Sequence, residues 1–176
     1  MTVTLDDLAR RVAAMEDIAA IIQLKHTYLR ACDRKQPEIV RACFIPDAVI
    51  DFEGFPVFTN RDDFVDLYAR FGCVPNVMDM HHMQNPIVTL TGPDTAEGLF
   101  DLYFFQIDTK ARTLIQLASS YEDSFVKRDG KWLFASSKSR RLSFLSEEVS
   151  ADGIVRVTGL GEQTGVAFGQ AVEAAE

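Results

Sequence analysis

Three long strand-like runs fill most of the second half of the chain, and they constrain the fold more than any other feature. They span residues 96–107, 113–126 and 131–144; a Gly92-Pro93-Asp94 turn precedes the first run, and Arg128-Asp129-Gly130 joins the last two. Consecutive runs with such short connections pair as neighbours in an antiparallel sheet. The run at 96–107 is apolar on both faces, which predicts that helices and another subunit cover it.

Helical patterns occupy most of the first half. Thr4 and Asp7 form a capping-box-like start, and apolar residues then recur at helical spacing as far as Leu29. A second, short helix is expected over residues 37–44, because Pro37 suits a first turn. A third is expected over 61–71, after Asn60 as its cap.

A strand pair is expected between the second and third helices, with residues 48–52 and 55–58 joined by a turn. The element order then predicts an α+β fold, a cone-shaped curved antiparallel sheet with the N-terminal helices packed on it. We expect this domain to span residues 1–145. The remainder, 146–176, is glycine-rich and is expected to be an arm over the pocket or a neighbouring subunit, or a partly disordered tail.

Composition excludes several classes of partner. The chain has 176 residues, a net charge of −8 and a pI near 4.9, so it would repel nucleic acid and anionic membranes. Its three cysteines lack CxxC spacing, which is typical of reduced thiols in the cytoplasm. No uncharged run approaches the ~18 apolar residues of a membrane helix. We therefore expect a cytoplasmic protein.

Two adjacent histidines, His81 and His82, are the most informative polar residues. Neighbours on a strand point to opposite faces, and no Cys/His cluster accompanies them, so we expect no metal site. A histidine oriented by a carboxylate is instead a general base, and Asp33 ends the long helix. The alternatives are that Asp33 caps the second helix or faces solvent, and that the histidines are ordinary strand-edge residues.

Three other residues are candidates for the functional site, and each could instead have an ordinary structural role. Tyr28 could donate to a substrate oxygen or be an amphipathic core tyrosine. Asp101 could be a carboxyl with a raised pKa or a partner for an arginine on a neighbouring strand. Arg140 belongs to a short basic cluster with Lys138 and Arg141, which is either a solvated strand face or a site for a substrate carboxylate.

Several segments together resemble one superfamily. They are Ile21-Ile22-Gln23-Leu24 through Tyr28 and Asp33, Phe44-Ile45-Pro46-Asp47-Ala48, His81 with Asn85-Pro86, Gly92-Pro93-Asp94-Thr95-Ala96, Tyr121-Glu122-Asp123 and Asp129-Gly130-Lys131-Trp132. These segments are similar to the nuclear transport factor 2-like superfamily and its SnoaL-like group. Among its enzymes, the chain resembles scytalone dehydratase, bile acid 7α-dehydratase and hexachlorocyclohexane dehydrochlorinase.

The resemblance implies an Asp–His pair that performs elimination without a cofactor. Asp33 matches the family's aspartate, and His81 is the expected base by its spacing to Asn85, with His82 as the reserve. Tyr28 matches the tyrosine of the dehydratases, which favours loss of water over loss of chloride. The later strands lack the second histidine of scytalone dehydratase.

The expected function is therefore a dehydratase-type β-elimination on a small hydrophobic ring substrate, by a homo-oligomer that is a dimer or a trimer. His82, Asp101 and Arg140 are expected to contact the substrate, since Asp101 or Arg140 could occupy the place of that missing histidine. The alternatives are an isomerase of the ketosteroid isomerase type, a non-catalytic protein that binds a hydrophobic ligand, and the small subunit of an aromatic-ring dioxygenase.

Overall fold

A computed structural model describes residues 3–161 of the chain. In this part the helices are α1 (Leu5–Asp33), α2 (Pro37–Ala42) and α3 (Arg61–Phe71). The strands are β1 (Phe44–Phe52), β2 (Val77–Leu90), β3 (Thr95–Asp108), β4 (Thr113–Arg128), β5 (Lys131–Val149) and β6 (Val155–Gly161). None of these helices is long and apolar enough to cross a membrane.

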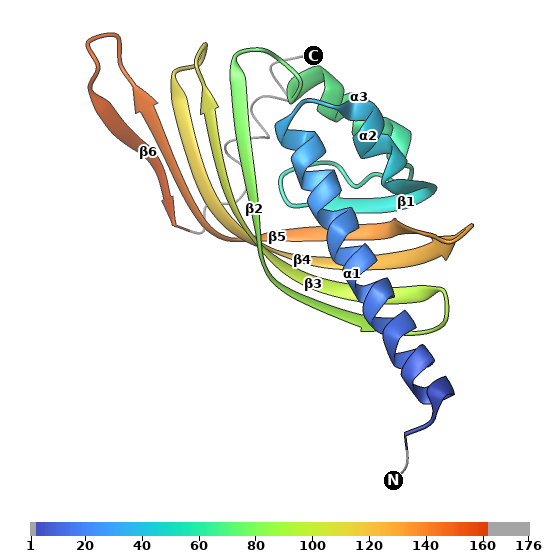
Figure 1. Ribbon diagram of the computed structural model, residues 1–176. Helices are drawn as coiled ribbons and strands as arrows, with labels where there is room; N and C mark the ends of the chain where they lie inside the picture. Colours follow the sequence, from blue (N-terminus) through green and yellow to red (C-terminus); the bar gives the residue numbers. More distant parts are fainter. Residues whose placement is uncertain (1–2, 162–176) are drawn as a thin grey trace.

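The strands form one curved, open sheet in the order β1-β5-β4-β3-β2. Every pairing is antiparallel except that of β1 with β5, which is parallel. The first half of β5 lies beside β1, and its second half, from Phe144 to Val149, lies beside β6. Figure 1 shows the helices gathered on one side of the curved sheet. The predicted α+β fold with N-terminal helices on a curved sheet is thus confirmed.

Helix α1 begins with the predicted capping box, in which Thr4 and Asp7 satisfy each other's backbone N–H groups. Its first half projects past the sheet in Figure 1, and Leu8, Val12 and Met15 are exposed there. The buried residues of α1 lie from Ile21 onward. The first turns of the helix therefore extend beyond the sheet. The helix contacts the sheet from Asp17 onward and ends at Asp33 beside β2.

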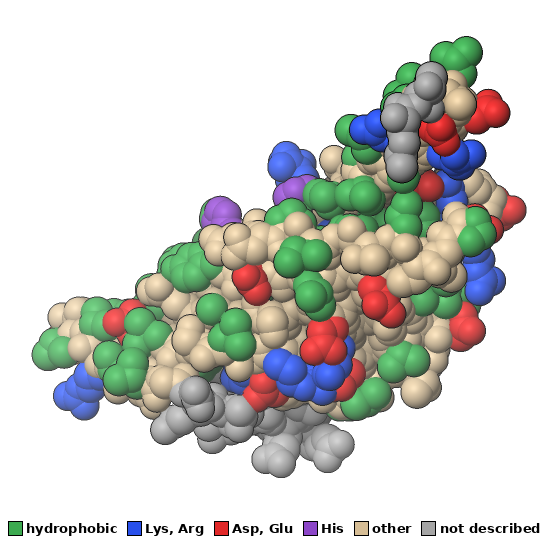
Figure 2. Space-filling view, turned by 90° about the horizontal axis from the view of Figure 1, so that it is seen from below, with side chains coloured by type: hydrophobic (Ala, Val, Ile, Leu, Met, Phe, Trp, Pro, Cys, Tyr) green, Lys and Arg blue, Asp and Glu red, His purple; other side chains and the backbone are tan. Residues whose placement is uncertain are grey.

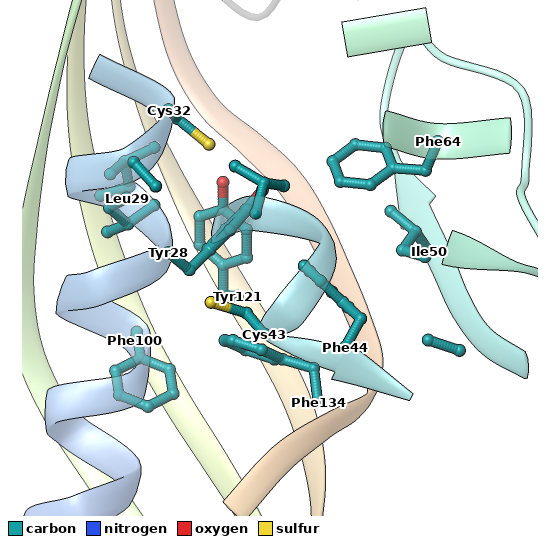
Figure 3. Close-up of a cluster of buried hydrophobic side chains, with 14 of the residues drawn as sticks. Tyr28, Leu29, Cys32, Cys43, Phe44, Ile50, Phe64, Phe100, Tyr121 and Phe134 are labelled. Carbon is teal, nitrogen blue, oxygen red and sulfur yellow. The ribbon is translucent and has the colours of Figure 1, made fainter. Parts of the chain in front are cut away.

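Aromatic side chains fix the second half of α1 to the sheet. Tyr28 meets Phe44 of β1 edge to face at 5.3 Å and Phe134 of β5 at 5.5 Å, while Phe44 and Phe134 stack at 4.8 Å. All three are buried, as Figure 3 shows. Such edge-to-face and offset pairs are the geometries that aromatic rings prefer. They set the position of the helix end relative to the strands.

The start of the first strand was predicted wrongly. Helix α2 ends at Ala42, and β1 begins at Phe44 and includes Pro46, which was expected to stop a helix. The pairing of β1 with β5 is interrupted between Phe44 and Val49, so Pro46 lies where no ladder hydrogen bond is required. The expected hairpin with residues 55–58 is also wrong, because β1 pairs with β5 and only a single bridge, Ile50 to Phe58, remains.

The end of the sheet also differs from the prediction. Strand β5 continues past residue 144 to Val149, and β6 follows it in the same sheet. The segment expected to be an arm from residue 146 therefore starts as sheet. Its last part, residues 162–176, lies outside the described residues.

Candidate active site

A cavity of about 770 Å³ opens on the concave side of the sheet. Its lining combines aromatic rings with a few polar side chains from α1, α3 and the long strands, among them Tyr28, Phe52, Tyr68, His81, Phe104 and Arg141. A mostly apolar cavity with a few convergent polar groups is the usual form of a small-molecule site.

Strand β2 presents alternate residues to this cavity. Asp79 and His81 line it, whereas His82 is exposed on the opposite face, where its ring lies 6.3 Å from that of Tyr103. The alternation follows from the period of two in a β-strand. Of the two adjacent histidines, only His81 is available to a molecule in the cavity.

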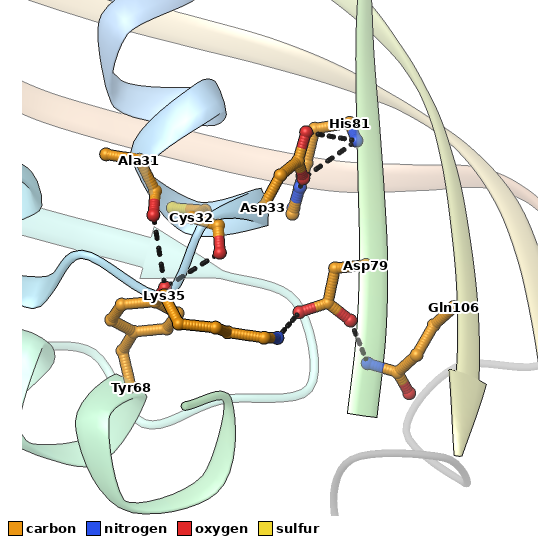
Figure 4. Close-up of polar contacts among 8 residues, drawn as sticks. All are labelled: Ala31, Cys32, Asp33, Lys35, Tyr68, Asp79, His81 and Gln106. Atoms are coloured by element: carbon orange, nitrogen blue, oxygen red, sulfur yellow. Dashed lines mark hydrogen bonds and ion pairs between the residues drawn. The ribbon is translucent and has the colours of Figure 1, made fainter. Parts of the chain in front are cut away.

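The carboxylate of Asp33 meets His81 at the end of α1. Nδ1 of His81 lies 2.6 Å from Oδ1 of Asp33, and the backbone N–H of His81 donates to the same carboxylate at 3.1 Å (Figure 4). An ionised carboxylate only accepts hydrogen bonds, so Nδ1 carries the proton. Nε2 is then the basic nitrogen, left for a ligand in the cavity.

A second polar tie holds the same two elements together. Nζ of Lys35, just after α1, lies 2.6 Å from Oδ2 of Asp79, whose Oδ1 accepts from Gln106 Nε2 of β3 at 2.9 Å (Figure 4). Asp33 and Lys35 of one segment thus pair with His81 and Asp79 of β2. Sequence reasoning missed this tie, although the i, i+2 spacing of Asp79 and His81 placed both side chains on one face.

Tyr28 is buried and lines the cavity. Burial is the main reason that its pKa is raised well above the ordinary value, and the neighbouring Cys32 thiol adds to the effect. The phenol is therefore neutral near pH 7 and carries a proton that a hydrogen bond can use.

The other three predicted site residues do not line the cavity. Asp101 accepts from Asn85 Nδ2 at 2.8 Å, and Arg140 forms an ion pair with Asp51 and donates to its backbone oxygen at 2.9 Å. Together with His82 they occupy strand positions that alternate with the cavity-lining ones. The expectation that His82, Asp101 and Arg140 contact the substrate therefore does not fit this cavity.

Arg141 takes the place in the cavity that was expected for Arg140. A β-bulge causes this: Ala118 pairs with Ser143 and Ser119 with Arg141, so Leu142 is an extra residue in β5. The bulge lets both Arg141 and Phe144 face inward. Regular alternation back from Phe144 would place Arg140 inside, and no sequence signal revealed the extra residue.

Metal ligands are not gathered in this part of the chain. Among residues 3–161, no group of three His, Cys, Asp or Glu side chains is arranged to hold a metal ion. The chemistry that these residues offer is proton transfer by His81 in an apolar cavity, supported by a carboxylate and a phenol.

Comparison with known families agrees with this architecture. The family model described as the SnoaL-like domain matches residues 13–138. The chain belongs to the SnoaL-like family. The resemblance predicted from the sequence motifs is thereby confirmed. The match includes Asp33 and His81 and ends at residue 138, before Arg141.

Solved structures show the same SnoaL-like fold at low identity. A candidate scytalone dehydratase from Novosphingobium aromaticivorans is 23% identical, with a TM-score of 0.69 over 82% of this chain and 92% of that one. LinA, a hexachlorocyclohexane dehydrochlorinase, is 23% identical, with a TM-score of 0.68 over 80% and 92%. A protein of N. aromaticivorans described as NTF2-like with a cystatin-like fold is 19% identical, with a TM-score of 0.67 over 85% and 94%.

Proposed function

We propose that this protein is a cofactor-independent acid–base lyase that eliminates water from a small hydrophobic ring substrate. The observation that carries the proposal is the 2.6 Å contact between Asp33 Oδ1 and His81 Nδ1, with His81 at the wall of a mostly apolar cavity. The names of two structural neighbours, a dehydratase and a dehydrochlorinase, also denote eliminations.

In the proposed reaction, Nε2 of His81 removes a proton from a carbon beside a carbonyl group. The electron pair of that C–H bond forms the new double bond, and the hydroxyl group on the next carbon departs. The proton held by His81 is then returned to the departing hydroxide, so the net products are an alkene and water. Asp33 stabilises the intermediate imidazolium, and Tyr28 donates a hydrogen bond to the substrate oxygen.

Proton abstraction can be tested before the leaving group is known. A panel of cyclic β-hydroxyketones is incubated with the enzyme in D₂O, and deuterium at the α-carbon is measured by mass spectrometry alongside the enone absorbance. His81→Ala and Asp33→Asn should each lower the rate by ~10²–10⁴-fold, because each removes part of the acid–base apparatus. His82→Ala, which alters the exposed neighbour, should keep the wild-type rate.

The results of this experiment also distinguish the lyase proposal from its alternatives. Deuterium exchange without enone formation would favour an isomerase of the ketosteroid isomerase type. Binding of panel members with no exchange at all would leave a ligand-binding protein. A wild-type rate in both His81→Ala and Asp33→Asn would end the lyase proposal.

A homo-oligomer, a dimer or a trimer, is also part of the proposal. On the outer face of the sheet Met80, Leu99 and Tyr103 are 49%, 52% and 39% exposed. Figure 2 shows hydrophobic side chains interrupting the polar surface of the molecule seen from below. Exposed apolar side chains gathered on one face are candidates for an interaction surface. Light scattering on the purified chain should give two or three times the mass of one chain, whereas a monomer would refute this part.

A further inference from the structure

We infer that the substrate carries a carboxylate that binds to the guanidinium of Arg141, across the cavity from His81. The observation is that Nε, Nη1 and Nη2 of Arg141 are all buried and that none of them has a hydrogen-bond partner among the described residues. Cζ of Arg141 lies 5.5 Å from the centre of the Phe144 ring. This inference rests on the proposed function and specifies its substrate class.

A buried, unpartnered guanidinium is costly, and arginine cannot lose its charge to avoid the cost. Buried charges in proteins are normally paired or bound to an ion. The cost is removed when an anion enters the cavity, so the arrangement favours an anionic ligand over a neutral one. The planar fork of donors matches a carboxylate, with two parallel hydrogen bonds.

The carboxylates nearby do not supply that partner. Glu53 lines the same cavity, but its Oε2 accepts from the backbone N–H of Arg141 at 2.7 Å. Asp79 is paired with Lys35, and Asp51 is paired with Arg140. The three donor nitrogens of the Arg141 guanidinium therefore have no hydrogen-bond partner among the described residues.

The sheet register places the carboxylate away from the reacting carbon. Arg141 of β5 pairs with Ser119 of β4, Ser119 with Leu102 of β3, and Leu102 with Met83 of β2, two residues beyond His81. Three strand spacings separate the backbones of Arg141 and β2, which is ~14 Å measured along the sheet. The substrate is therefore a ring compound whose carboxylate and acidic C–H lie on opposite sides of the ring.

Binding of a matched pair of probes tests this inference without turnover. The probes are 2-naphthoate and its neutral methyl ester, titrated calorimetrically into the full chain. Wild-type protein should bind the acid at least ~10-fold more tightly than the ester, which is the preference that one charge-assisted contact provides. Arg141→Gln should abolish the preference, and Arg141→Lys should retain part of it, since lysine keeps the charge but not the fork.

Arg140→Gln is the matched control, because Arg140 is adjacent in sequence but lies outside the cavity, and it should keep the wild-type preference. Equal affinity of the wild-type protein for acid and ester, undetectable binding of both, or an undiminished preference in Arg141→Gln would overturn the inference. A loss of preference in Arg140→Gln equal to that in Arg141→Gln would also overturn it, because the acid would then be bound elsewhere.

The two proposals fail in different ways. Binding of the acid that depends on Arg141, without proton abstraction from any substrate, would remove the lyase proposal and leave the carboxylate site. Proton abstraction that depends on His81, together with equal affinity of the wild-type protein for the acid and its ester, would keep the lyase proposal and remove the carboxylate site.

Discussion

Nζ of Lys25 lies 2.7 Å from Oδ2 of Asp123 inside the core, and neither side chain is exposed to solvent. Ser137 Oγ donates to the other oxygen of Asp123 at 2.6 Å, and the ammonium lies 3.4 Å from the centre of the Tyr121 ring. Burial lowers the pKa of Lys25 and raises the pKa of Asp123, so each charge depends on the other. This pair ties α1 to β4.

Removing one member of this pair should destabilise the fold strongly. Lys25→Met leaves Asp123 buried without its counter-charge, a loss of ~3–5 kcal/mol in the free energy of unfolding. The double variant Lys25→Met/Asp123→Leu should recover most of that loss, because no charge is then buried. Urea denaturation measures both. The exposed pair of Lys138 and Glu122 is the control, and Lys138→Met should cost no more than ~1 kcal/mol.

Asp17 should make stability depend on pH in the acid range. Hydrogen bonds from Lys127 and Trp132 hold its pKa below the ordinary value of 3.8. The contribution of Asp17 to the free energy of unfolding is therefore complete above the ordinary pKa of 3.8. It is lost as the pH falls through the lower pKa that Asp17 has in the folded protein. Asp17→Asn should cost ~1–2 kcal/mol at pH 6 and progressively less from pH 4 to pH 2. Urea denaturation of the wild-type protein and of Asp17→Asn across this range measures the difference.

Lys35→Met should slow the proposed reaction without removing any proposed catalytic group. Lys35 is paired with Asp79, two residues before His81 on β2, so its loss frees one of the two ties between the end of α1 and this strand. We expect the exchange rate to fall by about 10-fold, within the range reported for outer-shell partners. Lys138→Met is the charge-matched control. An unchanged kcat with a raised KM would instead indicate a role in substrate binding.

Arg141→Met should raise the melting temperature of the ligand-free protein. The substitution removes a buried cation without a described partner and keeps much of the side-chain volume. A gain of a few degrees by differential scanning calorimetry is expected for ~1 kcal/mol in a chain of this size. Arg140→Met breaks the ion pair with Asp51 and should lower the melting temperature slightly. A clear fall in Arg141→Met would show that the guanidinium already has a stabilising partner.

The general fold could be predicted because it follows from local patterns. On β3 the face with Phe100, Leu102 and Phe104 is buried, as expected. Leu99 and Tyr103 on the other face are exposed in the single chain, so the expected cover by another subunit stays a prediction. The parallel pairing of β1 with β5 could not be predicted in this way. It joins Ile50 to Ser137, which are separated by about half of the chain, and no local pattern encodes such a partner.

The candidate site could be predicted only where alternation along a strand is regular. Asp33 and one histidine were expected to meet, and the structure places His81 at Asp33; their roles stay a proposal. Arg141 could not be chosen over Arg140, because the extra residue at Leu142 changes which side chains face inward. The pair of Lys25 and Asp123 was missed because the two residues are 98 positions apart and come together only in the packed core.

The bulge at Leu142 determines which arginine of β5 faces the cavity, and so would any shift in the register of the strand. A one-residue slip turns every side chain of a strand to the other face. Without the bulge, and with Phe144 kept in the core, Arg140 would replace Arg141 at the wall. On β2 the same slip would exchange His81 for His82. Strands β2 and β5 thus each carry a residue of the same chemistry one position away, so a misregistered strand would still present an imidazole or a guanidinium to the cavity.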